Sequence, residues 1–149
     1  MRAVVQRVTQ AEVMVAERRT GRIGEGLMVL VGIDKKDSDD DVTWMADKLV
    51  HLRIFEDNAG LMNRCLLDTG GEILIVSQFT LMGDCRKGRR PSWSSAAAPD
   101  LANTLYLELV QTVRNYGVVT ATGEFQSMMN VALVNNGPVT LLLDSQKNF

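Results

Sequence analysis

The chain has 149 residues, with 16 Lys and Arg against 18 Asp and Glu, one His and two Cys. This length suits one domain over residues 1–149 with a proper core, and 23% charged residues with only three Pro argue against disorder. No apolar run approaches the roughly 18–20 residues of a membrane helix, and the N-terminus lacks the apolar segment of a secretory signal. Two Cys in an unsecreted chain predict reduced thiols and a cytoplasmic protein with no membrane contact.

The single histidine, His51, restricts the chemistry. An HExxH zinc site needs two His, and a structural zinc site needs four Cys or His ligands where this chain has only three such residues. Any Ser–His or Cys–His catalysis would have to use His51, and the G-x-S-x-G sequence of serine hydrolases is absent. We therefore expect an enzyme without metal or cofactor, if it is an enzyme.

The first half of the chain predicts strands followed by a helix. Alternating apolar and polar residues predict strands over 4–8 and 13–15, and the apolar run 27–31 predicts a strand that is covered on both faces. Ser38 is a suitable N-cap, and three Asp follow it in the first turn, where the helix dipole favours anions. Apolar residues then recur at helical spacing as far as Leu52.

The second half predicts more strands and one more helix. A short strand over 53–55 and a buried strand over 73–76 precede a polar loop over 83–95. A helix is expected to begin near Pro99 and to end before Gly117. Three further strands are predicted over residues 118–120, 128–134 and 139–143.

The order of these elements predicts an α/β (mixed α+β) fold. We expect mixed, largely antiparallel sheets packed with two helices, because strands at both ends have hairpin spacing. Residues 135–138 are interpreted as a tight, hairpin-like connection, and residues 144–149 as a frayed tail. Two helices cannot cover both faces of so many strands, so one face should pack on another sheet or on a partner subunit.

Ser77-Gln78-Phe79-Thr80 directly follows the predicted buried strand. The carboxyl end of a strand is a common place for a site, and this segment offers two hydroxyls, one amide and backbone N–H groups. Such groups can bind a carbonyl and stabilise an oxyanion. The alternative is that Ser77 and Thr80 satisfy a strand end while Phe79 lies in the core.

Two further polar features could serve a site. Asn135-Asn-Gly-Pro138 is either a functional backbone segment or a plain turn between two strands. Arg7 lies inside the first strand and is either an edge charge facing water or a buried cation that needs several acceptors.

A basic loop, Arg86-Lys87-Gly-Arg89-Arg90, concentrates four of the 16 basic residues in five positions. Phosphate contact is the functional interpretation, and the nearby Trp93 could stack or pack there. A solvated loop without a ligand is the alternative.

Ser77-Gln-Phe-Thr-Leu81 together with Asn135-Asn-Gly-Pro-Val-Thr140 resembles the paired signature of the D-aminoacyl-tRNA deacylases. The resemblance covers essentially the whole chain. It extends to Gln6–Val8, Arg53–Phe55, Met62–Asn63, Arg90–Ser92, Thr122–Gly123 and Phe125. Trp93 and Asn136 depart from the residues expected there, Phe and often Asp, but neither belongs to the core of a signature.

The resemblance implies a three-layer α/β/β fold of this family and a homodimer. It implies hydrolysis of the ester between a D-amino acid and the 3′-terminal ribose of tRNA, and removal of glycine mischarged on tRNA(Ala). The partners would be the 3′-terminal adenosine and the acceptor end of aminoacyl-tRNA. The cluster of basic residues makes Arg86, Lys87, Arg89 and Arg90 the candidates for contact with this tRNA. The resemblance further implies that Gly137–Pro138 is a cis peptide that enters the partner's active site, where Arg7 and Asn135 support chiral selection.

The catalytic groups implied by the resemblance are Ser77, Gln78, Phe79 and Thr80. Backbone N–H groups around Gln78–Phe79 would form an oxyanion hole, and the ribose 2′-OH would assist. A competing mechanism makes Thr80 a covalent nucleophile, although no general base is visible beside it. Two other functions stay open: a related deacylase that edits other residues, and a non-catalytic RNA-binding dimer.

Overall fold

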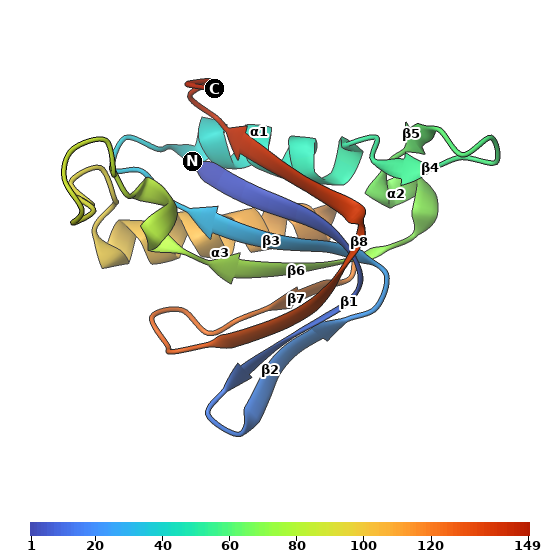
Figure 1. Cartoon of the computed structure of the whole chain (residues 1–149), viewed down its shortest axis with the longest axis horizontal. Helices are drawn as coiled ribbons and strands as arrows, with labels where there is room; N and C mark the ends of the chain where they lie inside the picture. The colour runs from blue at the N-terminus through green and yellow to red at the C-terminus, as the bar shows by residue number, and fades with distance from the viewer.

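The computed structural model describes all 149 residues (Figure 1). The strands are β1 (Arg2–Val15), β2 (Arg18–Ile23), β3 (Gly26–Gly32), β4 (Phe55–Glu56), β5 (Met62–Arg64), β6 (Glu72–Ser77), β7 (Thr120–Thr122) and β8 (Asn130–Asp144). The helices are α1 (Asp39–His51), α2 (Leu66–Thr69), the 3₁₀ turn η1 (Phe79–Met82) and α3 (Pro99–Asn115).

One curled, mixed sheet contains all strands except the small β4–β5 pair. Its order is β2-β1-β3-β6-β7, with β8 also paired to β1, and all pairs that involve β1 are antiparallel. β3–β6 and β6–β7 are parallel. β1 pairs with β3 through its first half and with β2 through its second half, so it carries the chain from one layer to the next. The predicted mixed, largely antiparallel fold is confirmed.

Two apolar cores lie on opposite faces of β3 and β6. Leu27, Val29 and Ile73 belong to the cluster that α1 and α3 cover. Met28 and Leu74 point the other way, into a smaller cluster under β2 and the second half of β1. This gives helices, sheet and a second sheet layer, visible in Figure 1 as α1 and α3 on one side and β2 on the other. Because both faces are covered, the strands have continuous apolar sequences.

The two predicted helices are confirmed. Ser38 caps α1, and its backbone N–H donates to the Asp41 carboxylate at 2.9 Å, which closes a capping box. α3 begins with Pro99 at its first turn. α2 and η1 were not predicted, because four residues are too few to display a helical period. Neither α1 nor α3 combines the length and apolar character that crossing a bilayer requires.

Several predicted strand boundaries are wrong. The strands predicted over 4–8 and 13–15 are one continuous strand, β1. The strands predicted over 128–134 and 139–143 are also one strand, β8, whose two halves pair with β1 in the same direction. The residues between Asn135 and Thr140 therefore form a bulge opposite β1 and not a hairpin turn.

Two short predicted strands also begin later in the structure. The strand predicted over 53–55 corresponds to β4, which contains only Phe55 and Glu56, and the strand predicted over 118–120 corresponds to β7, Thr120–Thr122. The two thiols remain unpaired: Cys65 is buried and Cys85 is exposed.

The chain end predicted to fray is tied down. The Asp144 carboxylate accepts hydrogen bonds from the Gln146 backbone N–H at 3.0 Å and from the Asn148 amide at 2.8 Å. Arg2 Nε lies 3.7 Å from the same carboxylate. Ser145 donates its backbone N–H to the carbonyl of Met1 at 2.9 Å. The polar residues that suggested a loose tail are the donors that hold it.

The pKa of Asp144 lies below its ordinary value. Burial alone would raise this pKa, but the hydrogen bonds from Asn148 and Gln146 outweigh burial. Because the folded pKa is lower than the unfolded one, the carboxylate stabilises the fold at pH values above the unfolded pKa. This contribution disappears as the pH falls through the lower, folded pKa.

We therefore expect Asp144→Asn to lower the free energy of unfolding at pH 7 by about 1–3 kcal/mol. The deficit should shrink at pH 3, where the wild-type carboxyl also begins to lose its charge. Urea unfolding at both pH values, followed by Trp fluorescence, measures this. Glu17→Gln, which changes an exposed carboxylate in a turn, is the matched control. An equal deficit at both pH values would contradict the assignment.

Candidate active site

The segment that follows β6 begins at Gln78 and is held by β3, while β6 itself is held by α3. Gln78 donates its backbone N–H to the Val31 carbonyl at 2.7 Å, which extends the β3–β6 pairing by one residue. Gly32 permits this approach, since a Cβ there would lie 2.9 Å from the Gln78 carbonyl oxygen. Beneath it, Tyr106 of α3 donates its hydroxyl to the Ile75 carbonyl at 2.8 Å, and burial raises the pKa of Tyr106 to about 12.

Two backbone N–H groups remain free at this segment. The N–H of Gln78 is already bonded to Val31, so it is not available to a ligand. Phe79 and Thr80 open the η1 turn, where the first N–H groups have no acceptor within the helix. The Gln78 N–H is therefore excluded as an oxyanion donor. The N–H groups of Phe79 and Thr80 are the candidates that remain.

No imidazole stands beside Thr80. The Gln78 side-chain amide donates a hydrogen bond to Thr80 Oγ1, and an amide cannot act as a general base. His51 lies at the end of α1, where its ring contacts Asp47 and the edge of Tyr116. Neither Gln78 nor His51 can therefore activate Thr80 as a nucleophile.

A mostly apolar pocket of about 660 Å³ opens next to Ser77. Its walls come from the ends of β3 and β6, the start of α3 and the β7–β8 connection. The wall residues that the sequence analysis did not assign to the site are Val31, Ile33, Val76, Ala96, Ala97, Pro99, Ala102, Phe125, Gln126, Ser127, Met128, Met129 and Val131. Met128 lines this pocket and is nevertheless 89% exposed. Nothing in the sequence around Met128 indicates that it belongs to a pocket wall.

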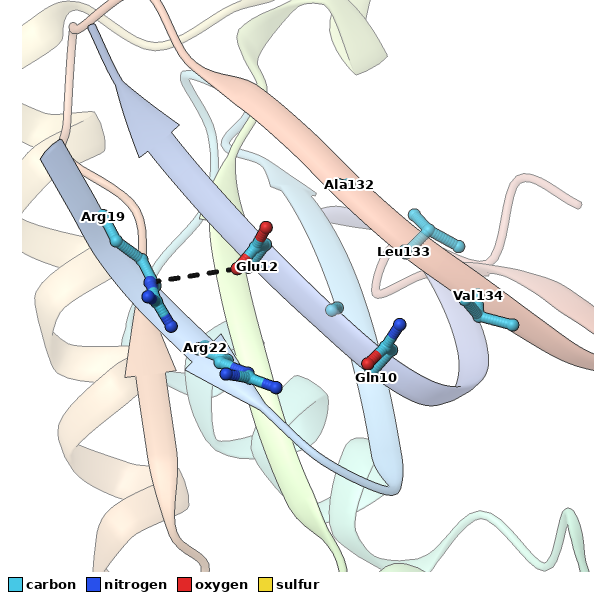
Figure 2. Close-up of a pocket in the computed structure, with 8 residues that line it drawn as sticks. Gln10, Glu12, Arg19, Arg22, Ala132, Leu133 and Val134 are labelled. Atoms are coloured by element: carbon cyan, nitrogen blue, oxygen red, sulfur yellow. Dashed lines mark ion pairs between the residues drawn. The ribbon is translucent and has the colours of Figure 1, made fainter. Parts of the chain in front are cut away.

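A second, smaller groove of about 270 Å³ lies on the outer face of β1 between β2 and β8 (Figure 2). Figure 2 shows Gln10, Arg22 and an ion pair between Glu12 and Arg19 along this groove, with 3.8 Å between the charged atoms. None of the predicted site residues lines it.

The second predicted segment, residues 135–138, has an exposed tip and contains a cis peptide and a glycine with positive φ. Gly137–Pro138 is a cis peptide, as the resemblance implied. Asn136, Gly137 and Pro138 are exposed at the bulge of β8. Gly137 has φ +118°, and a Cβ there would lie 2.9 Å from Arg7 Nη2 and from Val139 Cγ2. Only glycine fits this position without displacing its neighbours.

Arg7 is buried below this bulge, so the interpretation of an edge charge facing water is wrong. Its Nη1 donates to the Ile54 carbonyl at 2.6 Å and its Nε donates to the Asn136 carbonyl at 3.3 Å. Glu56 approaches Nη2 at 3.9 Å. Several acceptors therefore surround the guanidinium, as a buried Arg requires.

Asn135 also supports the bulge. Its Nδ2 donates to the Val139 carbonyl at 3.2 Å, and Thr140 Oγ1 lies 3.5 Å away. Its Oδ1 is buried and has no hydrogen-bond partner. The segment thus presents a buried acceptor beside the exposed Gly137–Pro138 tip.

The two predicted segments do not meet within one chain. Ser77 pairs with Val31 at the end of β3, whereas Arg7, which contacts the bulge, pairs with Leu27 at the beginning of β3. Four residues along β3 correspond to about 13 Å, and the three strand spacings from β8 to β6 add about 14 Å across the sheet. One protomer therefore holds both segments far apart.

The basic loop is exposed beside η1. Asp84 and Ser92 pair through two backbone hydrogen bonds, of 2.7 and 3.0 Å, which close the loop at its base. Arg86 binds the Asp84 carboxylate at 2.7 and 2.9 Å and holds the pKa of Asp84 far below its usual range. The three remaining cations form no ion pair within the chain: Lys87, Arg89 and Arg90.

The sequence model of the D-Tyr-tRNA(Tyr) deacylase family matches residues 4–144. The chain belongs to this family. It is 58% identical to a D-aminoacyl-tRNA deacylase of Desulfitobacterium hafniense and 56% identical to one of Thermosipho africanus, with both chains covered in full. Membership of the D-Tyr-tRNA(Tyr) deacylase family makes the protein a hydrolase and confirms the resemblance found in the sequence.

Two solved structures share the fold of this chain. The structure titled c-Myc DNA Unwinding Element Binding Protein is 36% identical, with a TM-score of 0.90 over 97% of this chain and 98% of that one. A probable eukaryotic D-amino acid tRNA deacylase is 22% identical, with a TM-score of 0.82 over 95% and 97%. The second likeness concerns the fold alone.

We expect Arg7→Met to lower the free energy of unfolding by about 1–3 kcal/mol, because the carbonyls of Ile54 and Asn136 lose their hydrogen-bond donor. Urea unfolding measures the loss. Arg22→Met is the matched control, since Arg22 is an exposed strand residue without an ion pair, and its effect should stay within about 0.5 kcal/mol. Equal losses in the two variants would refute the role given to Arg7.

Proposed function

We propose that this protein hydrolyses the ester between a D-amino acid and the 3′-terminal ribose of tRNA in the cytoplasm and releases free D-amino acid and tRNA. The observation that carries this proposal is the junction of the free Phe79 and Thr80 N–H groups with the apolar pocket beside Ser77. The pocket accommodates a flat nucleoside, and the N–H groups accommodate a carbonyl that becomes an oxyanion.

The terminal adenosine enters the pocket between its apolar walls, with Phe125 and Met128 beside the base. This places the ester carbonyl at the N–H groups of Phe79 and Thr80. Water attacks the carbonyl carbon, the bond to the ribose 3′ oxygen breaks, and the proton from water reaches that oxygen through the neighbouring 2′-OH. Positioning and oxyanion stabilisation are the contributions of the protein, because the ester is already reactive.

Selection for D-amino acids requires a second copy of the chain in this proposal. The Gly137–Pro138 tip of one protomer is exposed and lies far from its own Ser77, so it is free to enter the site of a partner. There its carbonyls accept hydrogen bonds from the substrate amino group and leave no space for an L side chain. A D side chain points outward, and glycine, including glycine on tRNA(Ala), passes because it has no side chain.

We expect the wild-type protein to hydrolyse D-tyrosyl-tRNA and glycyl-tRNA while leaving L-tyrosyl-tRNA intact. Gly137→Ala should lower the D-ester rate on the order of 100-fold, because the added Cβ collides with Arg7 and Val139 and displaces the tip. Deacylation time courses measure both results. Gly60→Ala is the matched control, since Gly60 also has a positive φ, +76°, but has open space around it.

Rapid loss of the L-ester would mean that the tip excludes nothing and that the protein edits other residues. No turnover of any ester by a folded protein would favour the RNA-binding alternative.

Thr80→Val and Thr80→Ser should both retain activity within about tenfold of the wild type, because backbone N–H groups survive the substitution. Single-turnover hydrolysis of D-tyrosyl-tRNA gives these rates, and mass spectrometry of the quenched native protein detects any acyl-enzyme. Complete loss in a folded Thr80→Val variant, together with an acyl adduct on the native protein, would establish Thr80 as the nucleophile.

A further inference from the structure

Two exposed aromatic rings stand together next to the pocket. Phe79 is 61% exposed and Trp93 is 39% exposed. Their ring centroids lie 5.8 Å apart at an interplanar angle of 57°. Large apolar side chains grouped at a surface mark a place where something binds.

The indole of Trp93 is held in place from below. A Cβ at Gly83 would lie 3.3 Å from the indole Nε1, so the ring rests on the bare backbone of this glycine. The Trp93 carbonyl accepts the Ala96 N–H at 3.0 Å, which fixes the turn that carries the ring. The ring is thus oriented before any ligand arrives, which lowers the entropic cost of stacking.

The rings connect the pocket to the basic loop. Phe79 lines the pocket, and Trp93 touches Phe79 on one side. On the other side, the Asp84–Ser92 backbone pair brings the loop that contains Lys87, Arg89 and Arg90 next to Trp93. A chain of nucleotides that leaves the pocket therefore meets an aromatic surface first and unpaired cations second. Aromatic rings beside a positive groove are the usual arrangement for single-stranded nucleic acid.

We propose that Trp93, supported by Phe79, is a stacking site for the nucleobase that precedes the terminal adenosine, and that the loop over residues 86–90 binds the adjoining phosphates. This inference rests on the proposed function, because it takes the single-stranded 3′ end of tRNA as the ligand. It assigns Trp93 to binding and not to the chemical step, since Trp93 does not line the pocket and adjoins it only through Phe79.

Substrate length separates this role from a structural one. D-Tyrosyl-adenosine contains the ester and the 2′-OH but lacks the preceding nucleotide, whereas D-tyrosyl-tRNA contains both. Trp93→Ala should lower kcat/KM for the tRNA ester about tenfold, mainly through KM, and leave kcat/KM for the adenosine ester within about twofold. Trp93→Phe should restore the tRNA ester to within about threefold of the wild type, because it retains an aromatic face.

Tyr116→Ala is the matched control. Tyr116 is also exposed, by 38%, but it lies at the other end of α3 beside His51. Its replacement should change neither substrate. A loss for Trp93→Ala that is equal on both esters would overturn the proposal, and so would no loss on either.

A binding measurement tests the site without catalysis. The protein has two Trp, so Trp44→Phe leaves Trp93 as the sole indole. Titration with the trinucleotide CCA should quench its fluorescence, and titration with adenosine alone should quench it far less. Absence of quenching by CCA would overturn the stacking site.

Sedimentation of the wild type and of Trp93→Ala completes the test. An unchanged molar mass is expected, whereas conversion from dimer to monomer would assign Trp93 to contact between copies and refute the stacking site. If the wild type hydrolyses neither ester, the proposed function fails, and quenching by CCA then decides the stacking site separately.

Discussion

The buried guanidinium of Arg7 is the contact on which the second half of the site depends. It joins two segments that no strand pairing connects: the backbone before β4, through the Ile54 carbonyl, and the bulge of β8, through the Asn136 carbonyl. Desolvating a cation is costly, so it remains buried only because these acceptors surround it. The same contact closes the space around Gly137, where an added Cβ would lie 2.9 Å from Nη2. The exposed tip is therefore supported from beneath by Arg7 although it projects from the surface.

The direction of the strands then decides where each half of the site lies. Ser77 stands at the carboxyl end of β6, and the parallel β3–β6 pair brings Gly32 and Val31 to the same end. β8 runs antiparallel to β1, and its bulge faces the opposite end of β3. A single curled sheet thus carries the proposed carbonyl-binding segment at one end and the exposed Gly137–Pro138 tip at the other. This separation within one chain is the reason that the proposed site takes its tip from a second copy.

Much of this arrangement could be predicted from the sequence, and the failures have a common physical cause. The caps and apolar periods of α1 and α3 depend on neighbours in the chain and were predicted well. The continuity of β8 through Asn135–Pro138 was missed, because residues typical of turns also form bulges when a partner strand continues on both sides. Arg7 and the tail after Asp144 were ambiguous for a similar reason, since their acceptors and donors are distant in the sequence or supplied by the fold. The pocket wall at Met128 exists only after β7 and β8 are brought over the end of β6.

The proposed chemistry uses backbone N–H groups and no side-chain base, which agrees with the side chains found at the candidate site. No imidazole stands near Thr80, and the side chains at the segment after β6 are hydroxyls, an amide and a phenyl ring. The proposed mechanism relies on fixed backbone dipoles, which need no change of protonation and cost no reorganisation during the reaction. Backbone groups cannot recognise the identity of a side chain, but they are well suited to recognise the arrangement around an α-carbon. In the proposed function, such backbone groups would discriminate by chirality across many amino acids without a general base.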